Sequence, residues 1–121
     1  NVAWPLEFLG VRPREAQKRA AAALERVGVD SGTRRRSPAQ MSGGEQQRIS
    51  IARALVTEPV LLLCDEPTGN LDSRNGQAIL ELLRALNRER SLTVVLVTHN
   101  TYAATYGHRV LEIEDGRVVS D

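Results

Sequence analysis

The 121-residue chain has few of the features that mark out special classes of protein. Only 3% of its residues are aromatic, so aliphatic side chains must fill its core. Its one cysteine, Cys64, excludes an intrachain disulfide, and no apolar stretch approaches the roughly 20 residues needed to cross a bilayer. A net charge of +1 argues against a nucleic-acid binder driven by bulk electrostatics. These absences leave an ordinary soluble globular segment, compatible with a reducing compartment.

Lysine is nearly absent as well. The only lysine, Lys18, lies in a predicted helix far from any pair of glycines, and the pattern G-x-x-x-x-G-K-[ST] does not occur. The chain therefore lacks the lysine that holds the β- and γ-phosphates in that kind of loop. Its first residues offer neither an initiator Met nor a charged leader before an apolar run, so we expect it to begin inside a longer protein.

Turn residues and hydrophobic periodicity predict the first half as helical. Pro13 and Gly28 frame an amphipathic helix. Its apolar stripe consists of Ala16, Ala20, Ala23, Leu24 and Val27. Residues 29–40 are rich in Gly, Ser, Pro and Arg and predict a loop. Ser42, with Glu45 three residues later, forms a capping-box pattern that opens a second helix through about residue 56.

The second half alternates strands and helices. The apolar run 60–64 predicts a strand covered on both faces, residues 74–90 predict a helix, and residues 92–97 predict a second strand. A strand, helix, strand unit of this length makes a parallel pair with a right-handed crossover. Asp115 and Gly116, between the predicted strands 109–114 and 117–120, are a strong hairpin signal.

Charged side chains follow the two predicted parallel strands. Asp65 and Glu66 end the run LLLCDE, and His99 ends the run VVLVTH. Because ligands of open α/β sheets bind beyond the carboxyl ends of strands, we expect the three side chains at one edge. They suit a hydrated divalent cation, a general base and a polar contact to an anionic substrate. The alternative is that the two carboxylates cap the next turn and that His99 is a solvated loop residue.

Two places could contact a phosphate. The helix that follows Ser42, Gly43 and Gly44 offers unsatisfied N–H groups and the positive end of its dipole, although a simple capped helix start explains this pattern equally well. The basic run 34–36, RRR, is typical of a solvated loop, with a phosphate or lipid-headgroup contact as the alternative.

Taken together, four ordered motifs resemble those of the ATP-binding cassette (ABC) ATPases. Residues 41–48 (MSGGEQQR) are similar to the signature motif, 60–66 to Walker B and 69–72 (GNLD) to the D-loop, while His99 is similar to the switch histidine. The resemblance covers essentially the whole chain. It implies an α/β fold: a fragment of a P-loop NTPase with a helical subdomain at 1–57, followed at 58–121 by parallel-sheet core strands of the ATPase and a C-terminal β-hairpin. Walker A and the Q-loop are missing, so the resemblance places the chain in roughly the C-terminal half of the nucleotide-binding domain.

The same resemblance implies the cofactors ATP and Mg²⁺ and a role for each matching residue. Asp65 is expected to hold Mg²⁺, commonly through water, and Glu66 to act as general base toward the attacking water. His99 is expected to contact the γ-phosphate and orient the attack. In the family ATP lies between two domains, so the chain carries one half of each composite site.

The signature side of that composite site involves other residues. Ser42, Gly43, Gly44 and Glu45 are expected to bind ATP held by a partner subunit, and Asp72 to communicate across the interface. Glu45 stands where the family usually has Gln, and its carboxylate should repel a phosphate unless it turns back to cap the Ser42 N–H. We expect that capping geometry. Met41 replaces the usual Leu, and Asn100 replaces the common Asp, without removing a catalytic group.

The run 65–72 (DEPTGNLD) is more particular and resembles the branch that serves lipoprotein release, macrolide export and cell division. This resemblance implies an ATPase that drives a transmembrane permease subunit or domain, pairs with a second nucleotide-binding domain as a homodimer, binds no nucleic acid, and lies peripherally on the cytoplasmic face of the inner (plasma) membrane. The intact protein is expected to hydrolyse ATP and the chain alone to be inactive.

Two alternatives compete with this interpretation. One is a soluble ABC-type ATPase of chromosome maintenance or repair, but such proteins usually carry long coiled-coil arms before the signature motif, and the necessary heptads are absent here. The other is a catalytically silent module that only dimerises or docks on a partner. The sequence does not encode the transported substance.

Overall fold

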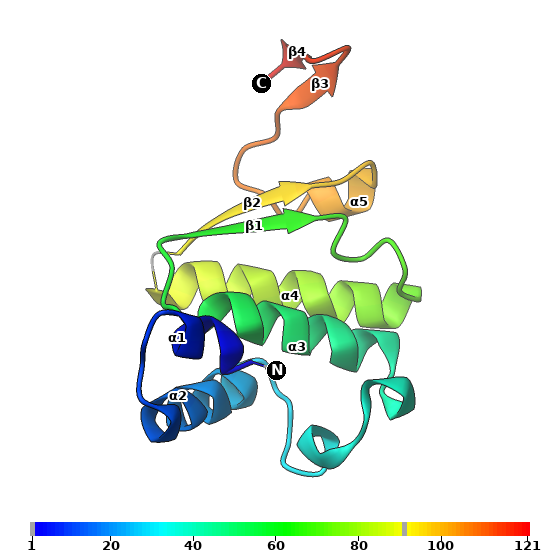
Figure 1. The fold of residues 1–121 in the computed structure, drawn as a ribbon. Coiled ribbons are helices and arrows are strands. Elements are labelled where there is room, and N and C mark those ends of the chain that lie inside the picture. The colour runs from blue at the N-terminus through cyan, green and yellow to red at the C-terminus, as the bar shows by residue number, and fades with distance from the viewer. Residues whose placement is uncertain (1, 91) are drawn as a thin grey trace.

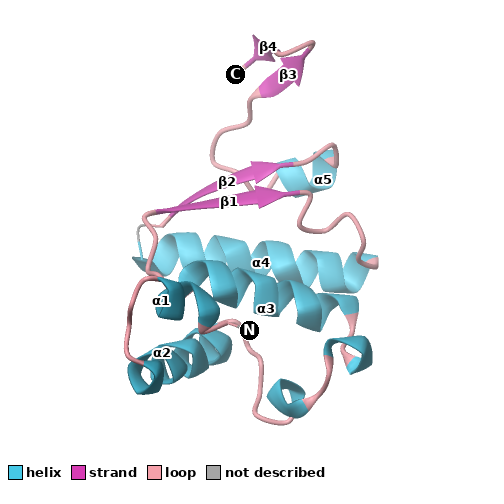
Figure 2. Cartoon of the chain, viewed as in Figure 1, coloured by secondary structure: helices cyan, strands magenta, loops and turns pink. Residues whose placement is uncertain are grey.

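The computed structural model describes residues 2–90 and 92–121. Helices make up its first half, and two small sheets lie in its second half (Figures 1 and 2). Within the described residues no helix is long and apolar enough to cross a membrane.

The first half is built from helices with clear sequence boundaries. Helix α2 spans Pro13–Arg26 with proline in its first turn, and Gly28 follows it at φ +75°, a backbone conformation that glycine adopts without strain. Helix α3 spans Gly43–Leu55 and begins at the Ser42 cap. Both predicted helices are confirmed. Ala16, Ala20, Ala23 and Val27 of the predicted stripe are buried, and Leu24 is half-buried.

Several short elements were not predicted. The expected loop 29–40 contains two single-turn 3₁₀ helices, η1 at Thr33–Arg35 and η2 at Pro38–Gln40. Helix α1 covers only Trp4–Phe8, and α5 only Thr101–Ala104. Elements this short display no hydrophobic period, so a pattern of apolar residues cannot reveal them.

The parallel pair is confirmed. Strand β1 (Leu61–Asp65) pairs with β2 (Thr93–Val97) in a register that sets Leu63 beside Val95 and Asp65 beside Val97. Helix α4 (Ser73–Arg90) connects the two strands. Beyond them, β3 (Glu112–Glu114) and β4 (Arg117–Ser120) form the predicted antiparallel hairpin. Its turn residues Asp115 and Gly116 lie at φ +47° and +74°, as an Asp-Gly turn requires.

Strand β1 is covered on one face only. Leu62 and Cys64 are buried, whereas Leu61 and Leu63 are exposed, Leu63 by 70%. Helices α3 and α4 lie on one side of the β1–β2 pair (Figure 2). The expectation of a strand buried on both faces is therefore wrong for this chain, because an apolar run reports a preference for burial and not whether both covering layers are present.

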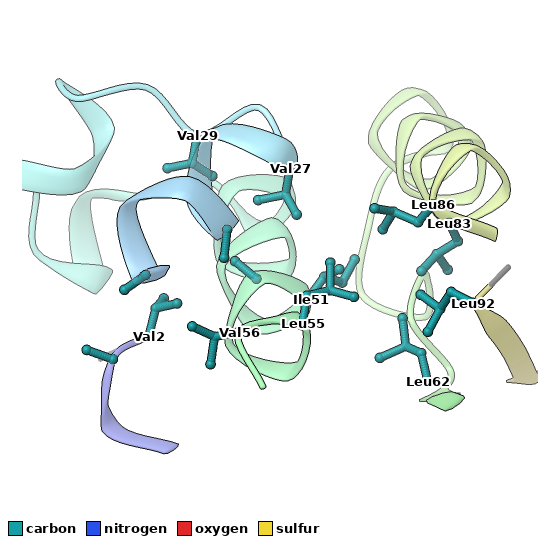
Figure 3. Packing of buried hydrophobic residues seen from close by; sticks show 14 of the residues in the cluster. Val2, Val27, Val29, Ile51, Leu55, Val56, Leu62, Leu83, Leu86 and Leu92 are labelled. Atoms are coloured by element: carbon teal, nitrogen blue, oxygen red, sulfur yellow. The ribbon is translucent and has the colours of Figure 1, made fainter. Parts of the chain in front are cut away.

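A single hydrophobic cluster joins the helices to the sheet. Ile51 and Leu55 of α3 lie at its centre (Figure 3). On one side of them are Val2, Val27, Val29 and Val56, and on the other are Leu62, Leu83, Leu86 and Leu92. Helix α3 thus packs between α2 and α4, which fixes residues 42–45 at its start relative to the ends of the strands.

Candidate functional site

The carboxyl ends of β1 and β2 bring residues 65–66 and 98–99 together. Parallel pairing continues one step past the strand, because the Glu66 N–H donates to the Val97 carbonyl oxygen at 2.9 Å. The next residues on the neighbouring strand end are Thr98 and His99. The predicted meeting of Glu66 and His99 at one sheet edge is thereby confirmed.

The Glu66 carboxylate accepts hydrogen bonds on both oxygens. Oε1 lies 2.6 Å from His99 Nδ1 and accepts the His99 backbone N–H at 2.8 Å. Oε2 accepts the Thr98 hydroxyl at 3.2 Å. The His99 ring and then its N–H are the main reasons that the pKa of Glu66 lies below its ordinary value, with a smaller contribution from Thr98. An ionised carboxylate only accepts, so Nδ1 carries the hydrogen in this contact.

Glu66 also has an unusual backbone. Its φ of +43° is left-handed, a region that costs a non-glycine residue free energy and that is often found at functional sites. The turn is closed by the Gly69 N–H, which donates to the Glu66 carbonyl oxygen at 3.1 Å. This sharp turn takes the chain out of β1 and holds the carboxylate beside the end of β2.

Asp65 lies exposed at the last position of β1. Among the described residues no group of three or more His, Cys, Asp or Glu side chains could hold a metal ion. Mg²⁺, however, commonly uses one or two carboxylates and takes its other ligands from water and substrate phosphates. A single exposed carboxylate next to the candidate base fits that mode of binding.

The start of α3 has the expected capping geometry. The Ser42 N–H donates to Glu45 Oε2 at 2.8 Å, and the Glu45 N–H donates to Ser42 Oγ at 3.2 Å. Arg36 Nη2 lies 2.7 Å from Glu45 Oε1. The Ser42 N–H is the main cause that lowers the pKa of Glu45, and Arg36 adds to it. The prediction that Glu45 turns back onto Ser42 is confirmed.

Gly43 and Gly44 pack closely against the segment that follows β1. A Cβ on Gly43 would lie 3.0 Å from Leu71 Cδ2, and a Cβ on Gly44 would lie 3.0 Å from Asn75 Oδ1. Only hydrogen fits at either place without movement of a neighbour. The start of α3 and the start of α4 therefore form one packed unit.

Asp72 is the cap of α4. Its Oδ1 accepts the Asn75 N–H at 3.0 Å, and its Oδ2 accepts the Asn75 side-chain amide at 2.5 Å. The Asn75 N–H is the first cause that lowers the pKa of Asp72. Asn75 thus lies between Asp72, to which it donates two hydrogen bonds, and Gly44, against which its side chain packs.

The predicted site residues fall into two groups. Asp65, Glu66 and His99 lie at the sheet edge, while residues 42–45 and Asp72 lie where α3 meets α4. Within the part of the chain that the structure describes, no hydrogen bond or ion pair joins the two groups directly, and the loop 66–72 connects them.

Sequence reasoning missed the residues that hold these groups. They are Thr33, Arg36, Leu71, Asn75 and Thr98. Asn75 could have been found, because an Asp just before a helix commonly caps it by accepting the backbone N–H of the residue three positions later. Arg36 could not, because its contact with Glu45 spans nine residues across an irregular loop.

Comparison with known proteins decides the family. Residues 3–69 match the sequence profile described as ABC transporter, which is more than half of the chain. The chain belongs to the ABC transporter family. This confirms the ABC ATPase fold that its motifs predicted, here with one parallel and one antiparallel strand pair.

Two curated relatives of this ABC chain represent the predicted branch. It is 46% identical over its whole length to the lipoprotein-releasing system ATP-binding protein LolD of Geobacter metallireducens, of which it covers 53%. It is 50% identical over its whole length to the macrolide export ATP-binding/permease protein MacB 1/2 of Paracoccus denitrificans, of which it covers 18%. The chain therefore spans about half the length of LolD and a smaller share of MacB.

Solved structures of ABC transporter cassettes also match this chain. The dimeric structure of the bacterial ABC transporter cassette MJ0796 matches with a TM-score of 0.82 and 41% identity, over 98% of this chain and 53% of that one. A second dimeric structure of the same cassette, in a post-hydrolysis state bound to ADP and Pi, matches with a TM-score of 0.76 over 91% of this chain.

Proposed function

We propose that this ABC chain is part of an ATPase that hydrolyses ATP to drive a membrane partner. The observation that carries the proposal is the Glu66 carboxylate, which a left-handed turn and three hydrogen bonds fix at the carboxyl edge of a parallel pair. A fixed, ionised carboxylate at that edge is the group that a hydrolase needs to accept a proton from water.

Each residue at the sheet edge has its own part in this proposal. Glu66 takes the proton of the attacking water, and Thr98 and the His99 N–H fix the carboxylate in place. The His99 side chain is 87% exposed, so the imidazole is accessible to a substrate phosphate while Nδ1 stays on Glu66. Asp65 is the carboxylate that would hold Mg²⁺. When bound, the ion supplies positive charge that offsets the charge of the phosphates.

The start of α3 serves the second half of the site. In our proposal Ser42, Gly43 and Gly44 present N–H groups and the helix dipole to ATP bound by another nucleotide-binding domain. Glu45 caps that helix start, and Asp72 lies beside it through Asn75. The chain lacks the pattern G-x-x-x-x-G-K-[ST], and so it needs phosphate ligands from elsewhere. The dimeric form of the MJ0796 cassette supports a partner domain.

The names of the relatives support a more specific role. LolD is named for lipoprotein release, and the MacB proteins join an ATP-binding part and a permease in one polypeptide. We infer that the whole protein drives lipoprotein release or the export of macrolides or peptides, that it works with a permease subunit or domain, and that it lies on the cytoplasmic face of the inner membrane. The bound ADP and Pi of the MJ0796 structure support ATP as the substrate.

Phosphate release from ATP by the full-length protein tests the proposal. Wild-type protein is expected to hydrolyse ATP, and Glu66→Gln is expected to reduce kcat by at least about 100-fold, the usual minimum for loss of a general base. Glu58→Gln is the matched control, because Glu58 also has a left-handed φ, of +54°, but pairs with Arg19 away from the sheet edge. Wild-type protein without ATPase activity, or equal activities of the two glutamine variants, would refute the assignment.

A further inference from the structure

The start of α3 contains an electrostatic conflict. Glu45 is in the first turn, where a carboxylate stabilises the helix by facing the positive end of its dipole. The same helix start is the place where the proposed function puts a phosphate, and two like charges repel one another. The N–H groups of Gly43 and Gly44 have no acceptor within the helix, so a free carboxylate nearby would compete with the phosphate for them.

Three donors occupy the Glu45 carboxylate. Oε2 accepts the Ser42 N–H at 2.8 Å. Oε1 accepts the Thr33 hydroxyl at 3.3 Å and an Arg36 N–H at 2.7 Å. The side chains of Glu45 and Arg36 are 28% and 43% exposed, so water weakens the ion pair, and the two further donors add to the hold on the carboxylate.

The loop before α3 holds Arg36 next to the Glu45 carboxylate. Thr33 is buried, and its N–H donates to Asp30 Oδ1 at 2.8 Å, which anchors the turn. The Thr33 hydroxyl also accepts an Arg36 N–H at 2.6 Å. Thr33 therefore fixes both members of the ion pair. Arg34, in the same basic run, makes another contact: its guanidinium donates to the Val29 carbonyl oxygen at 3.2 Å.

We propose that Arg36 is a positioning residue for the signature motif, which neutralises Glu45 and holds its carboxylate back on Ser42 so that the start of α3 still accepts a phosphate. Arg36 does not touch the phosphate itself. This inference rests on the proposed function, because it assumes that the start of α3 binds ATP. It also predicts that Glu at this position does not weaken the binding of an anion at the start of α3.

Steady-state kinetics of the full-length protein with Mg²⁺ and varied ATP test the inference in two backgrounds. In the Glu45 background, Arg36→Gln leaves a carboxylate uncompensated and is expected to raise KM for ATP roughly ten-fold, with kcat changed less than about three-fold. In the Glu45→Gln background there is no carboxylate at position 45, so loss of the Arg36 charge leaves no negative charge uncompensated. There we expect KM to stay within about three-fold of the Glu45→Gln single variant. Arg35→Gln, a change of equal charge at the exposed neighbouring position, is expected to leave KM within about two-fold of wild type.

The two backgrounds separate an electrostatic role from a purely structural one. An equal rise in KM in both backgrounds, or no rise in either, would overturn the inference while leaving the proposed function intact. An inactive wild-type protein would instead refute the proposed function, and the inference would fall with it. If the Arg36→Gln single variant does not fold, the variant that combines Arg36→Gln with Glu45→Gln is the test. It is expected to fold and to bind ATP as tightly as the Glu45→Gln variant. A roughly ten-fold weaker affinity for ATP would refute the inference.

Discussion

His99 Nδ1 lies 2.6 Å from Glu66 Oε1, although the two residues are 33 positions apart in the sequence. The parallel register of β1 and β2 creates this contact, because both strands end at the same edge. The candidate general base and the candidate switch histidine are thus one hydrogen-bonded pair. The His99 side chain therefore affects the protonation of Glu66.

This pairing predicts how Glu66 titrates. The hydrogen bonds favour its ionised form, so the pKa lies below the ordinary value of 4.5, and the stability they add is complete above that value and is lost as the pH falls through the lowered pKa. His99→Ala removes the largest cause and is expected to move the pKa of Glu66 upward. The pH dependence of the Glu66 carboxyl-carbon NMR signal measures this.

The second histidine supplies the control for that titration. His108 is exposed, and among the described residues no hydrogen bond or ion pair joins it to Glu66. His108→Ala should leave the Glu66 titration unchanged. An equal upward shift in both variants, or no shift in His99→Ala, would show that the contact does not set the charge of Glu66.

A second prediction concerns the packing of the signature glycine. Gly44→Ala places a methyl group 3.0 Å from Asn75 Oδ1, and the Asn75 side chain cannot move away without losing its amide hydrogen bond to Asp72 Oδ2. We expect a loss of about 1–3 kcal/mol in the free energy of unfolding, as for other overpacked sites. Urea denaturation measures it, and the further change Asn75→Ala should recover part of the loss.

Gly76→Ala is the matched control for that change. Gly76 lies inside α4, and an added Cβ would meet Thr68 Cβ at 3.5 Å, an ordinary contact. Alanine in a helix interior gains up to about 1 kcal/mol over glycine, so this variant should be as stable as wild type or more so. Equal stabilities of the two alanine variants would contradict the packing account.

A third prediction concerns the helix cap. Asp72→Ala removes both acceptors of Asn75 and is expected to cost about 0.5–2 kcal/mol of stability, the usual range for an N-cap. Asp72→Asn keeps an acceptor oxygen and should retain most of that stability. Thermal unfolding compares the two. If both variants lost the same stability, charge rather than capping would be the main contribution of Asp72.

Much of the fold could be predicted because its signals are local. Pro13, Gly28 and the Ser42–Glu45 box frame helices by backbone chemistry, and Asp115 with Gly116 sets a turn. The pairing of β1 with β2 followed from the length of the connection, and this pairing brought Glu66 and His99 together. The exposed face of β1 could not be predicted, because burial depends on the layers that cover a strand and not on its own residues.

The contacts that tune the candidate site lay beyond sequence reasoning. Arg36 reaches Glu45 across an irregular turn in which Thr33 contacts both residues, and no hydrophobic period or motif predicts that arrangement. The fit of Asn75 against Gly44 depends on the packing of α3 against α4. Sequence reasoning thus identified the chemical groups, and the structure identified the residues that hold them.

In the proposed function Glu66 is the base for hydrolysis and is not needed for assembly of the dimer. The most direct test is to incubate full-length Glu66→Gln protein with ATP and Mg²⁺, and to measure its molar mass by light scattering together with phosphate release. The account predicts an ATP-dependent dimer that persists, with turnover reduced at least about 100-fold. Near-normal hydrolysis by this variant would contradict the central claim.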